Sequence, residues 1–143
     1  MLHIDIITPD GTVYQGDASS ISLPTPDGEI TILPHHIPLI SILVPGTILV
    51  RLGSEEFLFA VSRGVIDVDG MTIRVLADTA DRAEKLEETA IMEAKKNAEK
   101  LLSEKRHDAE GYADATAILE QELARLHTIR RRHGSRSGSK PRE

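Results

Sequence analysis

The spacing of apolar residues changes near Asp78, and this change restricts the chain to strands followed by helices. Before Asp78, short runs with a period of two are separated by turn signals about every ten residues, as in small all-β domains. Asp69-Gly70 is the strongest hairpin dipeptide, because it suits a tight turn between residues 65–68 and 71–75. Eight to ten short strands with this spacing predict a small β-sandwich or barrel.

Beyond Asp78, proline and glycine become rare, and the helix formers alanine, glutamate, lysine and leucine take their place. Two apolar stripes recur at spacings of three and four residues, as on one face of a helix. The stripes are Ala83, Leu86, Ala90, Ala94, Ala98 and Leu101, and then Tyr112, Ala115, Leu119, Leu123 and Leu126. A break near residues 106–107 with Asp108 as N-cap, or alternatively a break at Gly111, would join them into an antiparallel helical hairpin.

These patterns divide the chain into three parts. We predict a β-sandwich domain over residues 1–78, a helical hairpin over residues 79–132 and a disordered tail over residues 133–143. The tail is basic and has no apolar face, a composition typical of disorder.

One segment of the strand-rich half is unusually rich in proline and histidine. Residues 28–39 read G-E-I-T-I-L-P-H-H-I-P-L. Pro34 and Pro38 cannot donate a hydrogen bond to a sheet, so we expect a stiff, irregular or edge crossing rather than a central strand. This crossing would carry His35 and His36 at one end of the β-structure.

Composition excludes several kinds of site and partner. Aromatic residues make up 3% of the chain, so the core has to be aliphatic. The absence of cysteine excludes disulfides, thiolate metal sites and cysteine nucleophiles. A net charge of −6 argues against nucleic acid as the main partner. No apolar run approaches the ~20 residues of a membrane helix and no leader precedes Leu2, so we expect a soluble intracellular protein.

No catalytic or metal-binding constellation emerges from the motifs. Adjacent histidines in an extended segment point to opposite sides, so His35 and His36 cannot easily share one metal ion. Neither a nucleophile elbow nor a phosphate-binding loop is present, and the carboxylate pairs at 55–56 and 87–88 fall on solvated faces. The basic run at 130–132 lacks interleaved aromatic residues, which favours a solvated terminus or an acidic protein partner over RNA.

The predicted hairpin buries little area by itself, because short isolated helices are marginal in water. It therefore has to dock on the sandwich or on another protein. Docking energies that differ by only a few kcal/mol would make it a switch, and a larger difference would fix it on the sandwich. Composition leaves both alternatives open.

Several motifs together resemble the epsilon-subunit family of the F-type ATP synthase of bacteria and chloroplasts, from Leu2 to about Arg131. The most specific are T-P-D-G-T-V-Y-Q-G at 8–16, L-P at 23–24, G-E-I-T-I-L-P at 28–34 and H-I-P-L at 36–39. P-G at 45–46, S-R-G-V at 62–65 and L-A-D at 76–78 also fit.

The resemblance implies a ten-stranded β-sandwich, a helical hairpin and a non-catalytic rotor subunit that couples proton flow to ATP synthesis. In that family the sandwich packs on the gamma subunit and stands on the ring of c subunits. The stretch 28–39 would lie at the ring-facing end. The c-ring contact would then include Glu29, Leu33, Pro34, His36 and Pro38.

The resemblance also implies that the hairpin can extend along gamma towards the alpha and beta subunits and inhibit ATP hydrolysis. The basic end of its second helix would suit acidic surfaces there, and it consists of Arg125, Arg130, Arg131 and Arg132. Some members bind ATP through an Ile/Leu-Asp-x-x-Arg-Ala motif. Here Glu87 replaces the aspartate and Ala90 the arginine. Loss of this charged donor argues against ATP binding, and no cofactor is expected.

As part of such a complex, the protein would be peripheral to the cytoplasmic face of a bacterial plasma membrane, or to the stromal side of a thylakoid membrane. It would meet the membrane only through the complex. The alternative is a free-standing adaptor whose hairpin binds another helical partner, and co-purification with gamma separates the two. A small enzyme is disfavoured because no catalytic constellation emerges.

Overall fold

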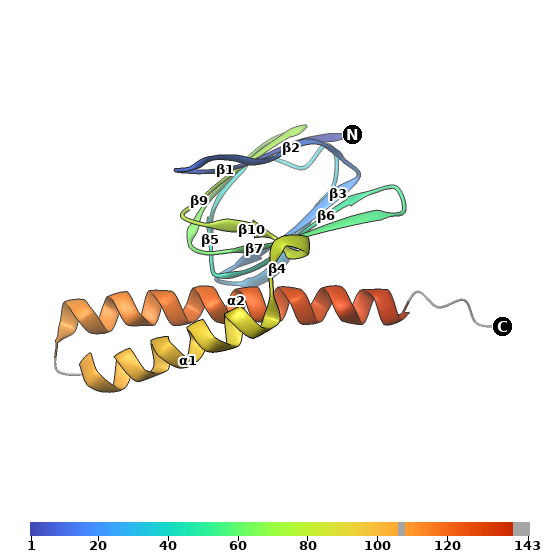
Figure 1. The fold of residues 1–143 in the computed structure, drawn as a ribbon. Helices are drawn as coiled ribbons and strands as arrows, with labels where there is room; N and C mark the ends of the chain where they lie inside the picture. Colours follow the sequence, from blue (N-terminus) through green and yellow to red (C-terminus); the bar gives the residue numbers. More distant parts are fainter. Residues whose placement is uncertain (106–107, 139–143) are drawn as a thin grey trace.

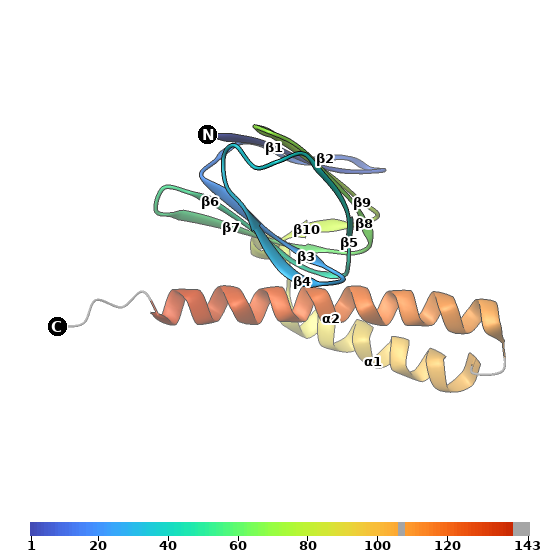
Figure 2. The ribbon, with the colours of Figure 1, turned by 180° about the vertical axis from the view of Figure 1, so that it is seen from behind.

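The computed structural model describes residues 1–105 and 108–138. This part of the chain forms a sandwich of two five-stranded sheets, with two helices beneath it (Figures 1 and 2). The strands are β1 (Leu2–Thr8), β2 (Gly11–Ala18), β3 (Ser20–Thr25), β4 (Gly28–Ile32), β5 (Leu39–Leu43), β6 (Gly46–Leu52), β7 (Glu55–Val61), β8 (Gly64–Asp69), β9 (Thr72–Ala77) and β10 (Ala80–Arg82). A 3₁₀ turn, η1 (Ala83–Lys85), leads into α1 (Glu88–Lys105) and α2 (Ala109–Gly138). The fold class is as predicted, with a sandwich rather than a barrel.

The two sheets enclose an aliphatic core. Sheet A has the strand order β2-β1-β9-β8-β5, and sheet B has the order β10-β7-β6-β3-β4. Alternating residues of β1 face inward, and Leu2, Ile4 and Ile6 are fully buried. Strands β1 and β9 run parallel, so Ile4 lies opposite Ile73, whereas the other pairs are antiparallel. Full burial of each such side chain contributes about 1.5–3 kcal/mol.

The proline-rich segment crosses between sheets, as predicted. Strand β4 is the edge strand of sheet B and β5 is the edge strand of sheet A, so residues 33–38 pass from one sheet edge to the other. His35 takes a positive φ of 68° within this link. Residues 28–32 belong to strand β4 and are regular, so the irregular part is shorter than expected.

The helices form a third layer. Helix α2 lies against the outer face of sheet B, and α1 packs on α2 from the other side (Figures 1 and 2). The break between the helices is the predicted one, because Asp108 caps α2 by accepting a hydrogen bond from the Gly111 N–H at 3.3 Å.

The element boundaries near residue 78 differ from the prediction. The short strand β10 pairs with β7, so sheet B continues to Arg82, and α1 begins only at Glu88. Ala83 therefore belongs to η1, where it is buried with Leu49 and Leu58 on the outer face of sheet B. Helix α2 continues to Gly138, past the predicted end at residue 132, and residues 139–143 of the predicted tail lie outside the described residues.

The helical stripes are only partly as predicted. Ala98, Ala115 and Leu126 are buried, whereas Tyr112 and Leu123 are 48% and 43% exposed. The reason is that α2 contacts both α1 and sheet B, so its buried residues cover two faces instead of one stripe.

Gly64 allows the close passage of β8 and β9. A Cβ atom there would collide with the carbonyl oxygen of Leu76 and lie 2.9 Å from the Cα atom of Ala77. We expect Gly64→Ala to lower the free energy of unfolding by about 1–3 kcal/mol, because the backbone has to shift. Urea denaturation measures this. Gly16→Ala is the control, since its nearest neighbour is the flexible end of Tyr14 at 3.3 Å, and an equal loss in both variants would contradict the steric explanation.

Candidate docking surfaces

Exposed aliphatic side chains form a row across the outer face of sheet A. Ile42 of β5 lies opposite Val65 of β8, and Val65 lies opposite Leu76 of β9. Their exposed fractions are 61%, 44% and 46%. Ile40, on the same face of β5, is 76% exposed. Because adjoining exposed apolar side chains mark interaction sites, this row, called here the sheet A patch, is suited to a protein partner.

Two features extend the sheet A patch. A shallow cleft of about 400 Å³ contains Ile40, Ile42 and Val65 and reaches Pro26 and Asp27 in the β3–β4 turn. In the link before β5, Leu33 and Ile37 are 58% and 75% exposed. The link also carries the predicted contact residues Pro34, His36 and Pro38. The predicted contact loop thus leads along the chain into an apolar surface.

The predicted contact residue Glu29 lies elsewhere. Its carboxylate pairs with Arg131 of α2, at 3.2 Å between Oε2 and Nη1. The link between β4 and β5 crosses on the side of the sandwich remote from α2 (Figures 1 and 2). The structure therefore groups four of the five predicted ring-contact residues and separates Glu29 from them.

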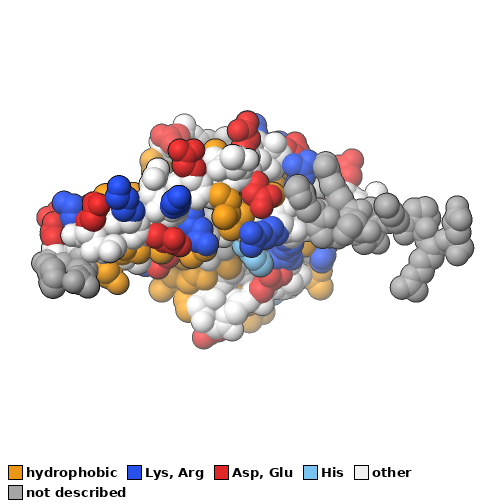
Figure 3. Space-filling view, turned by 60° about the horizontal axis from the view of Figure 1, so that its bottom comes forward, with side chains coloured by type: hydrophobic (Ala, Val, Ile, Leu, Met, Phe, Trp, Pro, Cys, Tyr) orange, Lys and Arg blue, Asp and Glu red, His pale blue; other side chains and the backbone are white. Residues whose placement is uncertain are grey.

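Helix α2 is attached to the sandwich by a series of polar contacts. One is buried, between the hydroxyl groups of Thr47 and Thr128, and the others are ion pairs that are partly open to water. Acidic and basic side chains are also interspersed over the outer face of the helices (Figure 3). The contacts are Arg125 with Asp81 (2.8 Å), Arg63 with Glu120 (3.1 Å), Arg131 with Glu29 (3.2 Å) and Thr47 with Thr128 (2.7 Å).

The contact between the two helices is of a different kind. Ile91 of α1 packs with Leu126 and Ile129 of α2, and Leu86 adjoins this cluster. Apolar contacts hold the hairpin together, while charged and hydroxyl groups contribute much of its attachment to the sandwich. Polar groups regain water when they separate, so these exposed contacts contribute little net free energy to the attachment.

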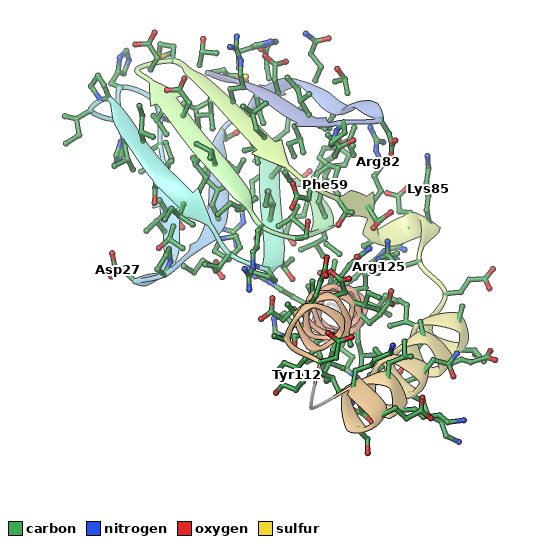
Figure 4. All side chains as sticks on the ribbon, turned by 90° about the vertical axis from the view of Figure 1, so that its left-hand side faces the viewer. Asp27, Phe59, Arg82, Lys85, Tyr112 and Arg125 are labelled. Carbon is green, nitrogen blue, oxygen red and sulfur yellow. The ribbon has the colours of Figure 1, made fainter. Side chains whose placement is uncertain are left out.

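Arg125 is the centre of the attachment. It lies between α2 and the β10–η1 segment that Arg82 and Lys85 mark in Figure 4. Its guanidinium donates to Asp81 and, at 2.9 Å, to Oε1 of Glu122. Glu122 is 5% exposed, and its Oε2 atom is buried without a hydrogen-bond partner among the described residues. A charged oxygen buried in this way lowers the stability of the docked form.

The predicted basic end of α2 is largely engaged within the chain itself. Arg125 and Arg131 are paired with carboxylates of the sandwich, and Arg130 lies 4.0 Å from Glu88. Arg132 lines a small cleft beside β7 and η1. Sequence reasoning identified these arginines but missed their acidic partners, because nothing local in the sequence signals a pair such as Glu29 and Arg131.

The segment that corresponds to the ATP motif borders a cleft of about 420 Å³ beside η1 and the two helices. Glu87 and Ala90 are in its lining, together with Asp81, Glu122 and Arg125. The lining holds three carboxylates and two cations, Lys85 and Arg125, of which Arg125 is already paired, so its net charge is unfavourable for a triphosphate. The absence of ATP binding stays a prediction, with this additional argument in its favour.

Among residues 1–105 and 108–138, no three His, Asp or Glu side chains gather in a group that could hold a metal ion. Within the same residues, neither helix combines the length and the apolar character needed to cross a membrane.

Known proteins resemble this chain along most of its length. Residues 1–83 match the family described as ATP synthase, Delta/Epsilon chain, beta-sandwich domain. The chain is 42% identical over 132 residues to the ATP synthase epsilon chain of Acinetobacter baumannii, covering 91% of this chain and 94% of the relative. The epsilon chain of Alkalilimnicola ehrlichii is 40% identical over 131 residues, covering 91% and 93%. Among solved structures, a chain of the Euglena gracilis mitochondrial ATP synthase, OSCP/F1/c-ring, shares the fold with a TM-score of 0.74 at 18% identity, covering 86% of this chain and 78% of that one.

The role of Arg125 can be tested by removing its charge. We expect Arg125→Met to weaken docking of the hairpin by about 1–3 kcal/mol, because Asp81 and Glu122 lose their shared donor. Amide hydrogen exchange along α2 measures the loss. Arg63→Met is the matched control, since its pair with Glu120 is exposed and worth about 0–1 kcal/mol. Equal protection in both variants would contradict a central role for Arg125.

Proposed function

This chain belongs to the family of ATP synthase epsilon chains, and on that premise we propose that it is a non-catalytic subunit of the central stalk, which turns with the rotor. It acts by position and by docking. The single observation that carries the proposal is the sheet A patch, an exposed apolar surface on a rigid sandwich. In this role the protein couples proton flow through the c-ring to ATP synthesis and is peripheral to the cytoplasmic face of the membrane.

The sheet A patch is the proposed docking surface for the gamma subunit. The ladder of sheet A fixes the backbone of Ile42, Val65 and Leu76, so they lose little backbone entropy when a partner covers them. A central group of apolar side chains with a polar rim is the usual anatomy of a specific protein interface. Within the proposed role, gamma is the subunit that turns with the sandwich, so it can cover the patch at every position of the rotor.

The c-ring contact is proposed for the predicted residues, in two groups. Pro34 and Pro38 stiffen the link, and a stiff segment suits a part that transmits torque. Glu29 offers a carboxylate at the other location, on the edge strand β4, where a cationic group of the ring can reach it. The link lies on the side of the sandwich remote from α2 and Glu29 lies beside α2, so the two groups are alternative ring contacts, one largely apolar and one charged.

The hairpin is proposed as a releasable brake on ATP hydrolysis. In the docked form, Arg125 and Arg131 are neutralised by carboxylates of the same chain. Release would free these cations for acidic surfaces of the alpha and beta subunits. The polar attachment to the sandwich and the buried, unpaired Glu122 oxygen support a docked form that is easily released.

The second candidate is a free-standing adaptor whose hairpin binds another helical partner. The exposed side chains of Met92 and Leu101 on α1 would suit such a partner. Binding to gamma is the property that separates it from the rotor subunit.

Binding to gamma can be tested by placing a charge in the sheet A patch. We expect Ile42→Glu to reduce the affinity for ATPase particles stripped of their epsilon subunit by at least about tenfold, because a buried unpaired carboxylate costs more than ~1.4 kcal/mol. Co-sedimentation with the particles measures this. Ile118→Glu, on α2 and 42% exposed in the wild type, adds the same charge elsewhere. Unchanged binding of Ile42→Glu would overturn the assignment of the patch, and absent binding of the wild type would favour the adaptor.

The brake can be tested by tying the hairpin to the sandwich. The hydroxyl oxygens of Thr47 and Thr128 lie 2.7 Å apart and the chain has no cysteine, so the pair Thr47→Cys and Thr128→Cys can form a disulfide without competition. We expect the oxidised protein to bind stripped particles without inhibiting hydrolysis. The same protein should inhibit after reduction, which makes it its own control. Inhibition that persists under oxidation would show that the brake needs no release of the hairpin.

A further inference from the structure

The pair between Glu29 and Arg131 uses both oxygens of one carboxylate. Oε2 accepts from Nη1 at 3.2 Å, and Oε1 accepts from Nη2 at 3.4 Å. This two-point arrangement occupies the edge that the two oxygens of a carboxylate present to a guanidinium. Within the described part of the chain, Glu29 has no second cationic partner. A further cation that approaches the carboxylate from the same side therefore has to displace Arg131.

The pair is placed where exchange of partners is easy. It borders a groove of about 480 Å³ between α2 and the sandwich, whose lining also includes Pro24, Thr47 and His127. The side chains of Glu29 and Arg131 are 47% and 29% exposed. An ion pair so open to water is weak, so a cation from another protein can displace Arg131 at little cost.

We propose that Glu29 is shared between two cations: Arg131 in the docked hairpin, and a lysine or arginine of the c-ring in the assembled stalk. The proposal rests on the proposed rotor function and couples two of its features, the contact with the c-ring and the docking of the hairpin. Seating the sandwich on the ring withdraws Glu29 from Arg131, and the C-terminal half of α2 loses one of its attachments. Contact with the ring and docking of the hairpin therefore compete.

The competition works in both directions. A ring that weakens hairpin docking by some factor must itself be bound more weakly, by the same factor, when the hairpin is docked. Because the exposed pair contributes little free energy, this factor is about two- to five-fold. This competition shifts the docking equilibrium of the hairpin only slightly. Full release of the hairpin depends on its other contacts with the sandwich, which have Arg125 at their centre.

The experiment measures the affinity of the full-length chain for an immobilised complex of gamma and the c-ring. This complex lacks alpha and beta, so the acidic surfaces proposed for the released hairpin are absent, and any contact of a loosened hairpin with gamma has to be controlled. The variants are Arg131→Gln, Glu29→Gln and the double variant. Glu120→Gln is the matched control, because it breaks the other exposed pair between α2 and the sandwich, with Arg63, and leaves Glu29 engaged. Hydrogen exchange of α2 in the free chain checks that Arg131→Gln and Glu120→Gln loosen the hairpin to a similar degree.

We expect Arg131→Gln to bind the complex about two- to five-fold more tightly than the wild type, because Glu29 is then free. Glu120→Gln should bind like the wild type, and the gain from Arg131→Gln should disappear in the double variant. An unchanged affinity for Arg131→Gln, or a gain that survives Glu29→Gln, overturns the competition while the rotor function stands. Failure of the wild type to bind the complex overturns the proposed function and this inference with it.

Discussion

Helix α2 makes apolar contacts with α1 on one side and polar contacts with the sandwich on the other. The arrangement of the hairpin depends on this separation. Towards α1 it presents Leu126 and Ile129, which bury apolar surface with Ile91. Towards the sandwich it presents Arg125 and Thr128, whose partners are polar. In the docked form, apolar association holds the two helices together. The polar side makes the docked position specific in geometry and modest in free energy.

The charges on α2 serve more than one state of the molecule. In an acidic chain, arginines clustered at one end can pair with several different carboxylates. In the docked form, Arg125 pairs with Asp81 and Glu122, and Arg131 pairs with Glu29. The same cations are the groups that an acidic surface of another subunit would attract. Because exposed ion pairs contribute little in water, exchange between such partners is governed by which one is nearby.

The sandwich could be predicted well from the sequence because a strand that is buried on one face alternates between apolar and polar residues. Leu2, Ile4 and Ile6 of β1 are the buried residues of such a pattern. Local sequence patterns predicted the wrong element boundary where a residue packs against an element that is distant in the sequence. Ala83 has helical spacing but is buried against Leu49 and Leu58 of sheet B, so the start of α1 was placed too early. The continuation of α2 to Gly138 was missed because that segment has no apolar face to reveal it. At the site, the arginines could be named in advance, but their carboxylate partners depend on how the hairpin folds back on the sandwich.

The parallel pairing of β1 with β9 has a consequence for how the molecule is made. Strand β1 leaves the ribosome first, yet its neighbours in sheet A include β9, the last long strand of the sandwich. Pairings between such remote segments form slowly, because the intervening chain has to be ordered before the contact is gained. Sheet A therefore closes only after β9 has been synthesised. Strand β10, which completes sheet B, and then the hairpin follow β9 in the chain, so the docking surface on sheet B is completed just before the helices that cover it.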